Sequence, residues 1–177
     1  LKAIFNDNNY AEEWRIEAET RGLVCVDSVV DGICQLTQEK SIALFESLNV
    51  LSQKELKERA DVMLENYVIT VEVEARCMLD MIKRQIIPAA RSAGLKEATD
   101  ELWGRLGKSV SSMQEEVDDL HEIDEFEQQA RKAREVRLTA MTEVRALCDE
   151  IEKLVLASDW PIAPYPELLF DDMNYCK

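Results

Sequence analysis

Residues 52–86 read SQKELKERADVMLENYVITVEVEARCMLDMIKRQI, and this stretch decides the fold. It opens with a capping box, because the Ser52 hydroxyl can accept from the backbone N–H three residues on while Glu55 reaches back. A helix-spaced apolar stripe follows, comprising Leu56, Ala60, Met63, Leu64, Tyr67, Val71, Met78, Ile82 and Ile86. The β-branched run 68–73 alone would favour a strand. Because the stripe continues through that run, we predict helix throughout.

Two further apolar stripes lie downstream and predict two more long helices. Pro88 is expected to kink or end the first helix, and residues 92–94 (Ser-Ala-Gly) to break it. The second stripe is Leu102, Leu106, Val110, Met113, Val117 and Leu120; the third is Phe126, Ala130, Ala133, Met141, Val144, Cys148, Ile151 and Val155. Asp124 and Glu127 are expected to cap the third helix. Short links make neighbours antiparallel, so we predict an all-α fold, either a three-helix bundle or an extended helical hairpin.

Shorter elements are predicted at both ends of the chain. A helix should run from Tyr10 to about Arg21 and stop at Gly22, and a second should start at Asp27 or Ser28 and restart after Thr37. We expect these N-terminal helices to pack at one end of the long ones. The stretch 160–166 holds three prolines, so it is expected to be extended and to pack back through its aromatic and leucine side chains.

Composition excludes several classes of protein. The chain has 21 basic and 36 acidic residues, a formal charge of −15, which disfavours nucleic acid and anionic lipid surfaces. No apolar run approaches the ~20 residues of a membrane span, and the N-terminal stretch is too polar for a signal peptide. The five cysteines, which include Cys25 and Cys176, form no CxxC pair. Cys34 and Cys77 have apolar neighbours and are predicted to be buried thiols in a reducing compartment.

Candidate chemistry is sparse. No glycine-rich phosphate loop occurs, and the only histidine, His121, sits among acids at a predicted helix end, where we expect it to be exposed rather than catalytic. Residues 114–129 hold eight acids, which raises a cation-binding hypothesis, but a solvated corner between helices explains them better. Glu72 and Arg76 suit an i, i+4 surface pair, and with Glu74 and Arg84 they form a second candidate set for a groove. We predict no catalytic, cofactor-binding or metal-binding residue.

Six strings, in order along the chain, resemble type III glutamine synthetases. The first is similar to that family's FNGxGYSxEW, although Asp7 and Asn9 replace its glycines, and the last resembles its closing WPxPxYxxLLF. The six lie at residues 3–14, 17–23, 39–45, 64–76, 86–90 and 160–170. Residues 171–177 extend past the usual end of the family.

The resemblance implies that residues 1–51 end a catalytic domain, 52–159 form the long-helix bundle and 160–177 are the extended tail. The intact protein would ligate ammonia to glutamate with ATP and Mg, as a cytoplasmic or organellar homo-oligomer. The catalytic residues lie upstream, so this piece would bind no cofactor and would serve packing and contacts with sister subunits. Because the chain starts at Leu1, we expect a region of a longer protein or a processed product. A stand-alone acidic module that binds a basic protein remains the alternative.

Overall fold

A computed structural model of the chain describes residues 4–94, 100–163 and 165–170. Helices are the only regular secondary structure in these ranges, which confirms the all-α prediction. None of these helices is long and apolar enough to cross a bilayer. The chain divides into two compact units, Leu1–Leu64 and Glu65–Lys177.

The first unit consists of short helices whose ends follow local capping rules. Ser28 Oγ accepts a hydrogen bond of 3.3 Å from the backbone N–H of Asp31, and Gly22 ends the first helix at a φ of 69°. Both features were predicted. The elements are α1 (Glu12–Thr20), α2 (Val29–Cys34), η1 (Gln35–Thr37) and α3 (Glu39–Ser47).

An aromatic and cationic stack fastens the segment before α1 onto that helix. The rings of Phe5 and Trp14 stack with centroids 4.7 Å apart. The Arg21 guanidinium lies 5.4 Å from the Trp14 ring centroid and donates a 2.7 Å hydrogen bond to the carbonyl oxygen of Ile4. Phe5 is therefore half-buried, while Ile4 stays 53% exposed.

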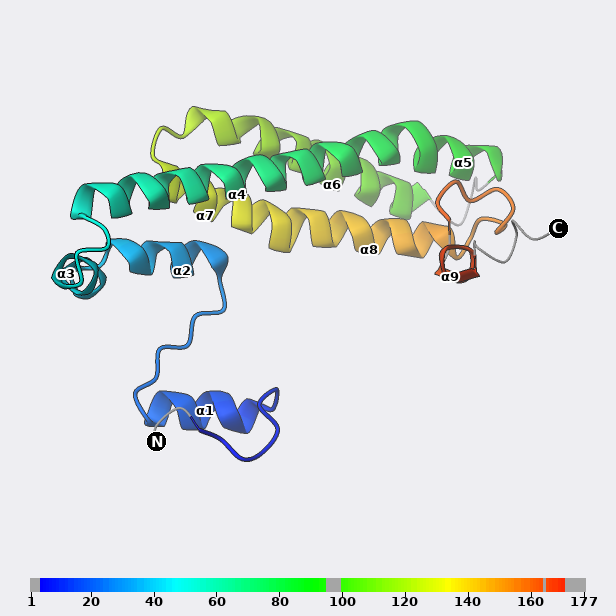
Figure 1. Cartoon of the computed structure of the whole chain (residues 1–177). Helices are drawn as coiled ribbons and strands as arrows, with labels where there is room; N and C mark the ends of the chain where they lie inside the picture. The colour runs from blue at the N-terminus through cyan, green and yellow to red at the C-terminus, as the bar shows by residue number, and fades with distance from the viewer. Residues whose placement is uncertain (1–3, 95–99, 164, 171–177) are drawn as a thin grey trace. The chain divides into compact units, whose positions relative to one another are not determined.

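The second unit is a bundle of three long helical segments, drawn side by side in Figure 1. The second segment along the chain runs opposite to the first and the third. The bundle and its antiparallel neighbours were predicted. The first segment, which begins in the first unit, is α4 (Gln53–Met81), η2 (Ile82–Ile86) and α5 (Ile87–Ser92). The second is α6 (Asp100–Asp118) with η3 (Asp119–Glu122), and the third is α7 (Phe126–Glu135), η4 (Val136–Ala140) and α8 (Met141–Glu152).

One apolar core joins the three segments. Leu106, Met113 and Val117 of α6 are buried against the first and third segments. Burying an aliphatic side chain of this size contributes about 1.5–3 kcal/mol, so the stripes are the main source of stability. The remaining core residues are Ala75, Leu79, Ile82, Ile86, Ala90, Val110, Val136, Ala140, Val144, Leu147, Cys148, Ile151 and Val155.

The core face of α4 differs in detail from the predicted stripe. Met63 is 42% exposed and Tyr67 only half-buried, whereas Val68, Ala75 and Leu79, which the prediction omitted, are buried. Adjacent positions of a helix are about 100° apart, so in the neighbouring pairs Met63–Leu64 and Tyr67–Val68 one residue is buried more deeply than the other. Similarly, Phe126 at the start of the third stripe is 38% exposed.

Pro88 does not end the helix, because the turn before it widens. The predicted break at residues 92–94 is confirmed, since α5 ends at Ser92 and Gly94 adopts a φ of 73°. Upstream, the N–H of Ile87 donates to the carbonyl of Ile82 in the π-helical turn η2, an i→i−5 bond. Pro88 has no N–H and its ring crowds the preceding turn, and the wider turn accommodates both effects.

Two predictions about helix starts were wrong. The helix α7 begins with Glu125 at its N-cap and without a side-chain cap, so Asp124 and Glu127 are not a capping pair. The segment 160–166 is not wholly extended either, because α9 (Tyr165–Phe170) contains Pro166. Proline is tolerated in the first turn of a helix, where its missing N–H would have no intrahelical partner.

Two glycines make a matched pair of stability predictions. A Cβ added at either Gly107, inside α6, or Gly94 would meet nothing within 4 Å, but only Gly94 has a positive φ. Gly107→Ala should raise the free energy of unfolding by about 0.5–1 kcal/mol through helix propensity. Gly94→Ala should lower it by about 1 kcal/mol through backbone strain. Urea unfolding followed by circular dichroism measures both, and equal shifts would contradict the prediction.

Candidate functional site

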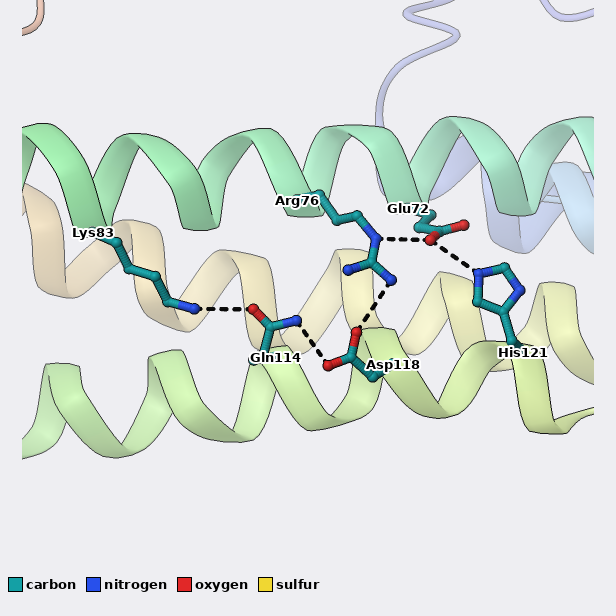
Figure 2. Close-up of polar contacts among 6 residues, drawn as sticks. All are labelled: Glu72, Arg76, Lys83, Gln114, Asp118 and His121. Carbon is teal, nitrogen blue, oxygen red and sulfur yellow. Dashed lines mark hydrogen bonds and ion pairs between the residues drawn. The ribbon is translucent and has the colours of Figure 1, made fainter.

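A polar seam joins α4 and η2 to α6 and η3, and it is defined as Glu72, Arg76, Lys83, Gln114, Asp118 and His121. Arg76 Nε lies 2.7 Å from Oε1 of Glu72, and Arg76 Nη2 lies 3.1 Å from Oδ1 of Asp118. Figure 2 shows Arg76 reaching from α4 between these two carboxylates. The predicted Glu72–Arg76 pair is confirmed, but it belongs to a contact between helices that sequence spacing did not reveal.

Two further contacts extend the seam along the helices. Lys83 Nζ donates to Gln114 Oε1 at 3.0 Å, and Gln114 Nε2 donates to Asp118 Oδ2 at 2.9 Å. At the other end, His121 Nε2 lies 3.0 Å from Oε1 of Glu72 (Figure 2). The His121 side chain is 59% exposed, as predicted. The six side chains therefore engage one another along the junction of α4 with the second segment.

The polar seam shifts the pKa values of two of its side chains, Glu72 and Arg76. Burial by itself would raise the pKa of the Glu72 carboxyl, but hydrogen bonds from Arg76 and His121 outweigh it, and the pKa falls below its usual 4.5. The hydrogen bond with Glu72 raises the pKa of Arg76. The Glu72 side chain is only 16% exposed, so its contacts are screened less than surface pairs.

A second polar junction joins the second and third segments. Ser109 Oγ donates to Glu143 Oε1 at 2.8 Å, and Lys132 Nζ lies 3.5 Å from Glu116 Oε2. The hydrogen bond with Glu135 raises the pKa of Lys132. These polar contacts lie along the junction of α6 with the third segment, just as the polar seam lies along the junction of α6 with the first segment.

The junction between α4 and α8 is different, because it is an apolar groove of about 1070 Å³. Met78 and Met141 form part of its wall and are half-buried on the core, and Trp160 from the C-terminal segment also lines it. Charged side chains stand at its rim, where Arg137 Nη2 lies 3.6 Å from Glu74 Oε2. A space of this size with mostly apolar walls is typical of a binding site.

The remaining candidates from the sequence form no assembled centre in the described ranges. Arg84 pairs with Asp80 on its own helix at 2.7 Å. The acidic stretch 114–129 forms the corner of α6, η3 and α7, and Glu127 pairs with Arg131 at 2.9 Å. Within residues 4–94, 100–163 and 165–170, no three His, Cys, Asp or Glu side chains are placed to hold a metal ion.

The cysteine prediction needs correction. Cys77 is exposed and Cys34 only half-buried, while Cys148 is buried. Cys77 is two positions from the buried Ala75, so it faces the opposite side of α4. Burial raises the pKa of the Cys148 thiol to about 11. Cys176 lies outside the described residues.

The structure thus defines a helical bundle with polar contacts at two junctions and an apolar groove at the third. A family model described as "Glutamine synthetase C-terminal domain" matches residues 1–99. The chain belongs to the glutamine synthetase C-terminal domain family, which confirms the resemblance seen in the six strings.

The relatives align with almost the whole chain. A type-3 glutamine synthetase of Dictyostelium discoideum is 24% identical over 198 residues, covering 96% of this chain and 27% of that protein. A glutamine synthetase of Butyrivibrio fibrisolvens is 24% identical, covering 96% and 28%. One of Bacteroides fragilis (strain YCH46) is 26% identical, covering 98% and 24%. The chain spans about a quarter of the length of these relatives.

The Glu72 carboxylate gives a pH-dependent prediction. Its pKa is lowered by folding, so its contribution to stability is present above pH 4.5 and is lost as pH falls through the folded-state pKa. Glu72→Gln should lower the free energy of unfolding by about 1 kcal/mol at neutral pH, and this difference should shrink below pH 4.5. Urea unfolding at several pH values measures it, with the exposed Glu65→Gln as control. A difference that grows on acidification would refute the assignment.

The two cysteines of the groove should differ in reactivity. At low micromolar chain concentration, a thiol reagent should modify the exposed Cys77 rapidly at neutral pH. Cys148 should react only after denaturation, because its thiol is buried and protonated. Peptide mapping by mass spectrometry distinguishes the two sites, and rapid native labelling of Cys148 would contradict the structure.

Proposed function

We propose that this chain is a non-catalytic helical part of an ATP-dependent glutamate–ammonia ligase and serves packing and contacts between subunits. Membership of the C-terminal domain family and the names of the relatives support the ligase. In this proposal ATP and Mg bind to the rest of the longer protein, which works in the cytoplasm or an organelle. Neighbouring subunits and the rest of the parent chain are the partners.

Two features of the bundle support the packing role: charged side chains pair between its helices, and apolar side chains form a core and a groove. The charged groups brought together between helices engage one another, as Arg76 does with Glu72 and Asp118. Apolar residues form the core of the bundle, and further apolar residues line the groove between α4 and α8. Such an arrangement stabilises a domain and offers a surface, which is what a structural region of a large enzyme requires.

The isolated chain should therefore have no ligase activity. Incubated with glutamate, ammonia and MgATP, it should form no glutamine above the background without enzyme. The full-length gene product should form glutamine under the same conditions. Measurable turnover by the 177-residue chain would show that the catalytic groups lie within it and would refute the packing role.

The size of the native gene product distinguishes the proposed ligase from the alternative, a stand-alone acidic module. An immunoblot of the source cells should detect a native product several-fold larger than 20.3 kDa. Removing residues 65–177 from that product should disperse its assembly in light scattering, because the bundle would no longer link subunits. A stable native product of 20.3 kDa would favour the acidic module that binds a basic partner.

A further inference from the structure

We propose that the segment between α1 and α2 is a β-strand that adds to the edge of a β-sheet in the rest of the parent protein. This linking segment is defined as residues 23–27, which read Leu-Val-Cys-Val-Asp. The inference rests on the proposed function, in which the rest of the parent chain is a partner. It specifies the segment that makes the contact and the kind of surface that receives it.

The first argument is the composition of the linking segment. Links on a protein surface are usually rich in Gly, Pro, Asn, Asp and Ser, because these residues favour turns. Residues 23–26 include none of these and consist of a leucine, two valines and a cysteine. Turn residues stand only at the borders, as Gly22 and Ser28. A short β-branched stretch with such borders has the composition and the length of a strand.

The second argument is the unpaired backbone of the linking segment. Within the described ranges, the backbone N–H and carbonyl groups of residues 24–27 have no hydrogen-bond partner. The link after α3 behaves differently, because Asn49 donates to the carbonyl of Glu46 and Val50 to that of Phe45, each at 3.0 Å. A row of free N–H and carbonyl groups is the template on which a further strand pairs.

The third argument is the exposure of the side chains. Val24 is 80% exposed and Val26 41% exposed, and Cys25 is also exposed. Successive side chains of a strand point to opposite faces, so Val24 and Val26 would share one face of the sheet. A sheet in a larger protein has an apolar layer on at least one face, and these valines would enter that layer.

Contacts within the first unit hold both ends of the linking segment. The N–H of Leu23 donates to the carbonyl of Ala18 at 2.9 Å, and Arg15 Nη2 lies 3.9 Å from Asp27 Oδ2. The next residue, Ser28, has extended backbone at φ −125° and ψ 131°. A segment fixed at both ends loses less conformational freedom when it binds, which favours strand addition.

The partner is a sheet edge that lies outside this chain. The described residues form no strand, so neither they nor the same residues of a second copy offer an edge. The chain spans about a quarter of the length of its relatives, so the larger part of each relative lies outside the aligned region. In strand addition the main-chain hydrogen bonds supply affinity and alternate side chains supply specificity, so no opposite charge is required.

Hydrogen–deuterium exchange of the full-length gene product, read residue by residue, tests the strand. Alternate amides among residues 24–27 should exchange about 100-fold more slowly in the full-length protein than in the 177-residue chain, because a sheet hydrogen bond must open before exchange. They should alternate because only every second N–H of an edge strand faces its neighbour. Exchange at the same rate in both proteins would overturn the proposal.

Two proline variants of the full-length protein form a matched pair. Proline is compatible with extended backbone but has no N–H, and the N–H groups of Cys25 and Val26 would face opposite edges of the strand. Of Cys25→Pro and Val26→Pro, one should abolish the slow exchange of its neighbours and the other should preserve it. Both side chains are exposed, so both variants should keep the wild-type circular dichroism spectrum. Equal effects of the two variants would contradict an edge strand.

The outcomes separate this inference from the proposed function. If removing residues 65–177 disperses the full-length protein while residues 24–27 exchange as fast as in the 177-residue chain, the structural role stands and the strand is wrong. A native product of 20.3 kDa would refute the proposed function and the strand together, because no larger protein would supply the sheet.

Discussion

The structure of the bundle depends on the burial of one face of the first long segment. Val71, Ala75, Leu79, Ile82, Ile86 and Ala90 lie on that face, and all are buried. The second and third segments contact it through their own stripes, and the contacts of Arg76 with Asp118 and of Glu74 with Arg137 form at its margins. With Ala75 and Ala90 on this face, neighbouring helices can approach closely, while the larger residues fill the space between them. Arg76 and Glu74, each next to Ala75 in sequence, are thereby aimed at opposite neighbours, Asp118 and Arg137.

Much of the fold could be predicted because its signals are local. The capping box is an example, since Glu55 Oε2 accepts from the backbone N–H of Ser52 at 2.8 Å and Ser52 Oγ accepts from that of Glu55 at 3.4 Å. In the second stripe Leu102 is half-buried, and the residues from Leu106 to Leu120 are buried as predicted. The choice between adjacent positions on α4 was harder, because Tyr67 and Val68 are both apolar and periodicity alone does not tell which faces inward.

The site could be predicted far less well, because its contacts are not local. His121 and Glu72 are 49 residues apart, and their meeting depends on how far α6 runs back along α4. The groove depends on the distance between α4 and α8, which no spacing within either helix encodes. The exposed position of Cys77 has a local explanation, but its apolar neighbours pointed to burial because they serve both the core and the groove. The acidic run 114–129 suggested a cation site, but α6, η3 and α7 distribute its carboxylates around the corner between helices.

The wide turn η2 lets the first segment contain one residue more than an ordinary α-helix of five turns without losing the register of its buried face. From Val71 to Ala90 the buried face takes nineteen residues for five turns, where an ideal α-helix takes about eighteen. The π-helical turn absorbs that one extra residue and returns Ala90 to the core. A single deletion within residues 82–86 would remove the extra residue, and an ordinary α-helix would then bring Ala90 to the same face, because about eighteen residues make five turns. Homologous chains that lack this residue would therefore keep the same apolar face after residue 86, with an ordinary helical turn in place of η2.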